Sequence, residues 1–232
     1  MQIDLDFKLQ NRADASIKLL ENLSSEMFDP DEWILCALSF DALPLTNIIA
    51  KRLHLKYDIL FIESVVAPNN KECKIASVTE CEDIVIHKEL SDSFDIGLDY
   101  IYDQSFIKYE EEILKRIQRY RNGEKIVAMN GKNVLFIEDS CEDNLISLSG
   151  IKTAINLGAK KIAYMCAVIP KELEMKYEKD IDELFYLYSA YNYINNQHYY
   201  IEKLKSLDDE DILPILENSE NFIINCKDEV TK

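Results

Sequence analysis

Glycine and proline are scarce in this sequence. Each occurs five times in 232 residues, roughly 2% against average usage of about 7% and 5%. The scarcity excludes collagen-like and linker-rich architectures. It also leaves little material for the glycine-rich loops with which many proteins bind phosphate groups.

Basic residues are few relative to acidic ones. Lys and Arg together number 26 and Asp and Glu 43, which gives a formal net charge of −17 at pH 7. Affinity for nucleic acid depends on neutralising phosphates, and anionic bilayers attract basic segments. A chain this acidic is therefore expected to bind neither nucleic acid nor a membrane surface.

Metal-binding and targeting patterns are missing as well. The six cysteines form no C-x-x-C pair and the three histidines lie far apart, so zinc-ligand spacing is absent. Cys36 and Cys166 lie inside apolar runs, where a thiol is usually a small buried hydrophobic group. The sequence opens without a signal-peptide pattern, and no apolar run approaches the ~20 residues of a membrane span. We therefore expect a cytoplasmic protein with reduced thiols.

What the sequence does contain is 47% hydrophobic residues, enough for a substantial core. Strands buried on both faces are predicted at 33–38, 57–62, 133–137, 161–168 and 183–188, and helices at 11–23, 44–55, 105–120, 146–157, 170–177 and 208–216. Two shorter, more polar strands at 75–78 and 84–87 suggest a hairpin or an outlying flap. This alternation predicts an α/β fold with a mostly parallel sheet flanked by helices.

Two acids follow one of the predicted buried strands. The apolar run 134–137 leads directly into Glu138 and Asp139. Ligands of parallel sheets bind beyond the carboxyl ends of the strands, and carboxylates there can bind ribose hydroxyls or hold magnesium through water. The same acids also suit the solvated start of the next helix, and their spacing alone does not decide between the two interpretations.

The strand, the two acids and the following helix resemble the signature of type I phosphoribosyltransferases. Further segments are similar to a bacterial branch of this family, in the same order: Phe7 with 11–15, 35–38, Ala67-Pro68 with Asn70 and Glu72, 119–123, and Tyr199-Tyr200 before 208–210. The resemblance covers about residues 7–215. It implies a single phosphoribosyltransferase-like domain over residues 1–218, in which 72–104 form a small irregular β hood or flap, followed by a C-terminal tail, 219–232.

The loops that handle phosphate depart from the family pattern. The family binds the 5′-phosphate of phosphoribosyl pyrophosphate with a Gly- and Thr-rich loop, whereas 140–147 has no glycine and carries Glu142 and Asp143. The family's Pro-Arg-Gly-Gly pyrophosphate loop corresponds to Ser39-Phe40-Asp41-Ala42, and Glu63-Ser64 stands where a basic pair is expected. Because all three changes remove glycine or positive charge, we expect the site to repel a polyanion.

These departures lead to a functional hypothesis. The resemblance assigns the residues of the degenerate ligand site as Glu138, Asp139, Ser140, Asp143, Asn144 and Ser147, with Ser39, Phe40 and Asp41 in the former pyrophosphate loop. Glu138 and Asp139 would also hold magnesium if the protein were active. The expected role is the binding of a small molecule or a protein, or regulation, without catalysis.

Two alternatives remain open. One is an active phosphoribosyltransferase that acts on an unidentified base. The other is a structural protein that self-associates, for instance as a homodimer, through its aromatic C-terminal third, which contains Tyr186, Tyr188, Tyr191, Tyr193, Tyr199 and Tyr200. Ordinary packing in the core and at its edges is the simpler interpretation of these tyrosines.

Overall fold

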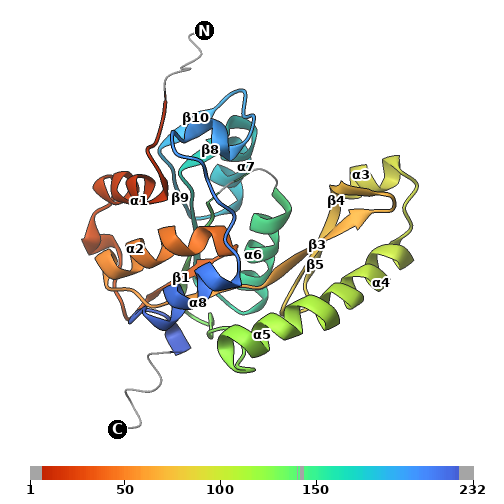
Figure 1. Cartoon of the computed structure of the whole chain (residues 1–232), viewed down its shortest axis with the longest axis horizontal. Helices are drawn as coiled ribbons and strands as arrows, with labels where there is room; N and C mark the ends of the chain where they lie inside the picture. Colours follow the sequence, from red (N-terminus) through yellow and green to blue (C-terminus); the bar gives the residue numbers. More distant parts are fainter. Residues whose placement is uncertain (1–6, 140, 142–143, 225–232) are drawn as a thin grey trace.

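A five-stranded parallel sheet forms the body of the protein. The computed structural model describes residues 7–139, 141 and 144–224. The strands β1 (Trp33–Ala37), β2 (Tyr57–Ile59), β6 (Asn133–Ile137), β7 (Lys161–Met165) and β9 (Glu183–Phe185) are ordered β2-β1-β6-β7-β9. Helices cover the sheet, as Figure 1 shows. The predicted fold class is confirmed.

The two faces of this sheet bury different sets of side chains. Leu35, Leu135 and Met165 pack in one cluster, together with residues of α1 (Arg12–Glu21), α2 (Leu43–Leu53) and α8 (Asp209–Glu217). Phe136 and Tyr164 point to the other face and pack against α6 (Asn144–Asn156) and α7 (Lys171–Asp180). Because both faces are covered, the central strands are continuous apolar runs rather than alternating ones.

Local sequence signals fix the ends of several helices. Oδ1 of Asn11 accepts a hydrogen bond from the Asp14 N–H (3.1 Å) and caps α1, and Asp208 forms a capping box with Asp211 at the start of α8. Pro44 lies in the first turn of α2, where its missing N–H costs nothing. In the described part of the chain, no helix is both long and apolar enough to cross a bilayer.

A second, antiparallel sheet projects from one side of the body in Figure 1. Residues 62–108, which comprise this sheet and the two helices after it, are called the hood below and extend beyond the predicted range 72–104 at both ends. The strands of this sheet are β3 (Ile62–Ala67), β4 (Asn70–Thr79) and β5 (Ile84–Ile86), in the order β3-β4-β5. The chain then forms α3 (Lys88–Ser93) and α4 (Leu98–Lys108), and returns to the body through a π-helical turn, η3 (Tyr109–Ile113), and α5 (Leu114–Arg121). The buried side chain of Ile101 packs α4 against strands β3 and β4.

Three of the predicted buried strands and one predicted helix divide differently in the structure. The chain leaves the parallel sheet after β2, and Ile62 begins β3; the prediction of one strand over 57–62 is wrong because Leu60 and Phe61 are also buried and extend the apolar run. The runs 161–168 and 183–188 are each split, and β8 (Val168–Pro170) pairs with β10 (Tyr188–Ala190) in a separate two-stranded sheet. The helix predicted at 105–120 begins at Leu98 and is interrupted by η3.

Both ends of the described chain pack against the body. Leu9 forms a parallel bridge with Tyr200, and Tyr57 of β2 forms one with Phe222. The rings of Tyr57 and Phe222 lie 5.5 Å apart and both are buried. Residues 219–224, the described part of the predicted tail, therefore contact the edge of the parallel sheet.

Candidate ligand-binding cleft

Glu138 and Asp139, called the acid pair below, lie directly after β6, at the carboxyl edge of the parallel sheet. The backbone N–H of Glu138 donates to the carbonyl of Met165 (3.1 Å), and the N–H of Leu38 donates to the carbonyl of Ile137 (3.0 Å). These bonds hold the end of β6 between the ends of β1 and β7. The side chains of Glu138 and Asp139 therefore start at the edge where parallel sheets bind ligands.

Asp139 is bound by two residues from distant parts of the chain. Nε and Nη2 of Arg12 donate to its Oδ2 at 3.0 and 2.9 Å. The side-chain amide of Asn196 donates to the same oxygen (3.2 Å) and to the Asp139 carbonyl (3.0 Å). Asp139 is only 3% exposed. Burial raises the pKa of its carboxyl group, and the hydrogen bonds from Arg12 and Asn196 act in the opposite direction.

Glu138 is bound by a buried tyrosine. The hydroxyl of Tyr164 donates to its Oε2, and the Tyr164 ring packs edge-to-face on Tyr177, with centroids 5.2 Å apart. Tyr177 in turn shares a hydrogen bond with the hydroxyl of Ser147. Ser147 is fully buried, so this predicted ligand-binding residue contacts α7 instead.

Two further predicted residues lie in the part of the chain that the structure does not describe. These are Ser140 and Asp143; Asn144 begins α6 and is half-buried. Of the six residues that the resemblance assigned to this site, Glu138 and Asp139 line the cleft described below, whereas Asn144 and Ser147 do not.

The loop that the resemblance assigns as the former pyrophosphate loop contains a 3-10 turn, Phe40–Ala42. Oγ of Ser39 caps it by accepting a hydrogen bond from the Ala42 N–H (3.2 Å). Oδ1 of Asp41 accepts a bond from the Leu207 N–H (2.8 Å) and lies 3.5 Å from Nη2 of Arg12. The loop therefore engages Arg12 and the segment before α8 through its own side chains.

A cleft of about 330 Å³, called the acid-pair cleft below, lies between these elements. It is lined by Leu38, Ser39, Phe40, Asp41, Ile62, Lys74, Arg116, Glu138, Asp139 and Ile146. The hood contributes Lys74 from β4, and α5 contributes Arg116, which pairs with Glu63 and lies over the Phe40 ring at 5.0 Å.

The cations at this cleft are what sequence reasoning missed. Lys74 and Arg116 line it, and Arg12 reaches Asp139 at its base. The expectation of excess acid came from comparing each strand-end loop only with its family counterpart. Arg12 lies 127 positions from Asp139, and no spacing pattern connects the two residues.

The structure offers the acid pair few further ligands for a metal ion. Among the described residues, no group of three His, Cys, Asp or Glu side chains is placed to hold a metal ion. The Oδ2 atom of Asp139 already accepts hydrogen bonds from Arg12 and Asn196, which compete with a cation for its lone pairs. The predicted magnesium site at Glu138 and Asp139 therefore gains no support from the donor set.

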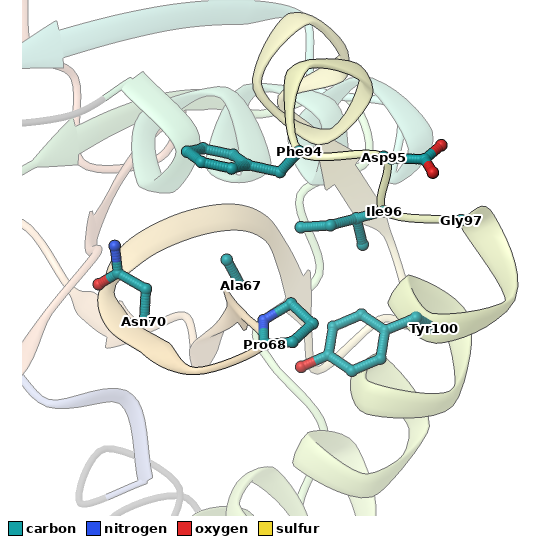
Figure 2. A pocket seen from close by; sticks show the side chains of 8 residues that line it. All are labelled: Ala67, Pro68, Asn70, Phe94, Asp95, Ile96, Gly97 and Tyr100. Carbon is teal, nitrogen blue, oxygen red and sulfur yellow. The ribbon is translucent and has the colours of Figure 1, made fainter.

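A second cavity, of about 320 Å³, lies at the outer end of the hood. Figure 2 shows Phe94, Ile96 and Tyr100 around Pro68, while the carboxylate of Asp95 points away from them. The Tyr100 hydroxyl donates to the carbonyl of Val66 (3.2 Å). This cavity offers apolar contact but few groups for chemistry, so the acid-pair cleft is the stronger candidate site.

Comparison with known proteins shows the fold. No protein-family model matches the sequence, and no curated protein does. Among solved structures, TT1426 from Thermus thermophilus superposes with a TM-score of 0.72 at 19% identity, over 91% of this chain and 99% of that one. The two proteins share their fold at an identity too low to carry over a function.

Two more distant structures have lower similarity. A hypothetical protein from Neisseria gonorrhoeae with bound ppGpp gives a TM-score of 0.44 at 9% identity, over 90% of this chain and 96% of that one. The hypoxanthine-guanine phosphoribosyl transferase of L. donovani gives 0.36 at 11% identity, over 75% and 73%.

Proposed function

We propose that this protein is a phosphoribosyltransferase-like binding protein without transferase activity, and that it binds a small polar molecule of low net charge in the acid-pair cleft. The observation that carries the proposal is the bonding of Asp139. The resemblance assigns this carboxylate to a sugar ligand, yet Arg12 and Asn196 already donate to its Oδ2 atom.

The free energy favours the bond from Arg12 to Asp139 over a hydrogen bond from a sugar hydroxyl. A ribose hydroxyl that took the place of Arg12 would leave a buried carboxylate without its cation, which costs about 3–5 kcal/mol. The hydrogen bond gained from a neutral hydroxyl contributes roughly 1 kcal/mol. The Arg12–Asp139 pair therefore stays formed, and the Oδ2 atom of Asp139 is not available to a sugar hydroxyl.

The cleft nevertheless retains features of a binding site. Asp139 lines the cleft, and its buried Oδ1 atom has no hydrogen-bond partner among the described residues. A ligand hydroxyl or amino group can donate to this oxygen once a neighbouring side chain of the cleft moves. Three acids and two cations line the cleft, and Arg12 pairs with two of these acids, Asp41 and Asp139. This balance of charge favours a ligand of low net charge. Its volume of about 330 Å³ is near the lower end of small-molecule sites.

The absence of transfer is tested by pyrophosphate release. The full chain is incubated with phosphoribosyl pyrophosphate, Mg²⁺ and each of the common nucleobases. We expect no release above the rate without protein. Release that depends on one of the bases would contradict the proposal and support the alternative of an active phosphoribosyltransferase.

Binding is tested by thermal unfolding with uncharged probes, namely adenosine, uridine and ribose. We expect at least one of them to raise the Tm by mass action. Ile146→Trp, which places an indole in the cleft, should abolish the shift, whereas Ile155→Trp on the exposed face of the same helix should keep it. If none of the three probes shifts the Tm, this part of the proposal fails.

A second candidate role, self-association, is favoured by one surface feature. Tyr191, Ile194 and Ile201 are 68%, 66% and 65% exposed, whereas Tyr199 and Tyr200 of the same region are buried. We propose that the exposed three side chains would form the contact between two copies. Light scattering on the full chain and on Tyr191→Ser/Ile194→Ser tests this, since these exposed changes leave the core intact. A dimeric mass that falls to that of a monomer in the variant is expected, and a monomeric wild type contradicts it.

A further inference from the structure

A larger cavity lies away from the acid pair, where the base of the hood meets the body. Its volume is about 610 Å³, nearly twice that of the acid-pair cleft. Three elements that Figure 1 shows near one another enclose it: the turn after β4, the η3–α5 helix, and the C-terminal end of α6. The extended segment 123–130 completes the wall. The cavity falls within the size range of small-molecule sites, about 300–1,000 Å³.

The walls of this hood-base cavity are mostly apolar. Ile117, Val127, Met129 and Leu157 supply aliphatic surface from three different elements. Two irregular features of the backbone also lie here: the π-helical turn η3, which contributes Tyr109, and the left-handed conformation of Glu82 (φ 61°). Both kinds of irregularity are enriched at functional sites.

Acidic groups gather at one end of the cavity. The carboxylate of Glu80 accepts hydrogen bonds from the Phe61 N–H (3.0 Å) and from Arg121. Arg121 also faces the buried carboxylate of Asp58 at 3.5 Å, so two buried acids share one guanidinium. Glu82 adds a further acid beside Glu80 in the lining.

Burial and the nearby acids raise the pKa of two groups in the lining. Burial, followed by the charges of Glu80 and Asp83, raises the pKa of the Cys81 thiol to about 11. Burial and the nearby acids, Glu82 first among them, raise the pKa of the Tyr109 hydroxyl. Lys125 is the cation of the lining, and its side chain is exposed.

The geometry points to a binding site for a small hydrophobic amine. An aromatic or alkyl body packs against Ile117, Val127 and Leu157, and its protonated amino group binds the exposed carboxylate of Glu82, because Arg121 and the Phe61 N–H already bond to the oxygens of Glu80. A neutral molecule of the same size gains only the apolar contacts. The site is separate from the acid-pair cleft, because Arg116 of α5 lines that cleft while Leu114 and Ile117 line this one.

The proposal is tested by isothermal titration of the full chain with 2-phenylethylamine and with 2-phenylethanol, which has the same body without the charge. We expect saturable binding of the amine at one site per chain. The alcohol should bind about tenfold more weakly, because it lacks a charge-assisted hydrogen bond. Equal affinities for the two probes, or no saturable binding of the amine, would overturn the proposal.

Substitutions of lining residues test whether the amine binds in this cavity. Ala128 lines it and is exposed, so Ala128→Trp fills the space without disturbing the core, and Ile155→Trp on exposed α6 surface serves as its control. Glu82→Gln should weaken binding of the amine but not of the alcohol. Glu89→Gln, at an exposed residue of the hood, should change the affinity for neither probe. If Ala128→Trp binds the amine as the wild type does, binding occurs elsewhere and the assignment is wrong.

Discussion

Arg12 and Asp139, 127 positions apart in the chain, form an ion pair with an N–O distance of 2.9 Å at the carboxyl end of β6. The pair joins the N-terminal helix α1 to the edge of the sheet where ligands of this architecture bind. Nη1 of Arg12 also donates to the carbonyl of Lys205 (2.7 Å), so the same side chain holds the segment before α8. Its position makes Arg12 a structural residue that joins α1, the end of β6 and the segment before α8.

The first prediction concerns the stability that this pair provides. Arg12→Ala leaves the carboxylate of Asp139 buried without its cation and should lower the free energy of unfolding by about 3 kcal/mol. Lys18→Ala removes a more exposed ion pair of the same helix, with Asp14 at 2.8 Å, and should cost less than about 1 kcal/mol. Urea denaturation measures both. Equal losses would show that the Arg12–Asp139 pair contributes no more than a surface pair.

The second prediction concerns pH. Burial raises the folded-state pKa of Asp58, Glu80 and Asp139 above their ordinary values of 3.8, 4.5 and 3.8. A folded state with raised carboxyl pKa values binds more protons than the unfolded chain. The contribution of these groups to the free energy of unfolding therefore decreases as the pH rises through the raised values. The surface acids Asp14 and Asp211 have lowered pKa values and titrate below this range.

As the pH falls from neutral toward the ordinary carboxyl values of 3.8 to 4.5, these three groups should therefore add to the free energy of unfolding. Urea denaturation at a series of pH values measures the slope, and Asp139→Asn should make it shallower by removing one of the three groups. A stability that declines steadily over this range would contradict the assignment of raised pKa values.

The third prediction concerns Arg121, which is completely buried. Its guanidinium bonds Glu80, faces Asp58 and lies over the Phe61 ring at 4.8 Å. Arg121→Ala should cost about 3–5 kcal/mol because two buried acids lose their cation, and Arg121→Lys should recover only part of this because an ammonium lacks the planar fork. Thermal and urea unfolding measure the series. Arg119→Ala, which removes an exposed ion pair with Asp209, is the control. If Arg121→Ala lowers the free energy of unfolding no more than Arg119→Ala does, the prediction is wrong.

The fourth prediction concerns the close approach of α6 to the sheet. A Cβ at Gly150 would lie 2.7 Å from Leu38 and 3.3 Å from Phe136. Gly150→Ala should therefore destabilise the fold by about 1–2 kcal/mol, since overpacking exceeds the gain in helix propensity. Gly97→Ala, where nothing lies within 4 Å, should change stability by less than about 0.5 kcal/mol. The same unfolding assay compares the two, and a stabilised Gly150→Ala would show that the helix can move away.

Much of the sheet could be predicted from local patterns. The strand Asn133–Ile137 has the bounds that its sequence predicts, because residues buried on both faces form a continuous apolar run. The same rule fails at 57–62, where buried residues continue from one sheet into another. Apolar runs report burial, and they do not report which partner strand provides it.

The candidate site could be predicted only in part. The position of Glu138 and Asp139 follows from the end of an apolar run, but their partners Tyr164, Arg12 and Asn196 come from other elements. Such partners are set by the tertiary fold, and one sequence contains no local signal for them. The hood-base cavity likewise depends on three distant segments, which explains why no motif indicated it.

Calorimetric titration of the full chain with phosphoribosyl pyrophosphate and Mg²⁺ tests the central claim most directly. With Asp139 held by Arg12 and Asn196, we expect no saturable heat up to millimolar ligand. Micromolar binding at one site per chain would show that the cleft accepts a sugar diphosphate, and would contradict the claim that the protein's own side chains occupy Asp139.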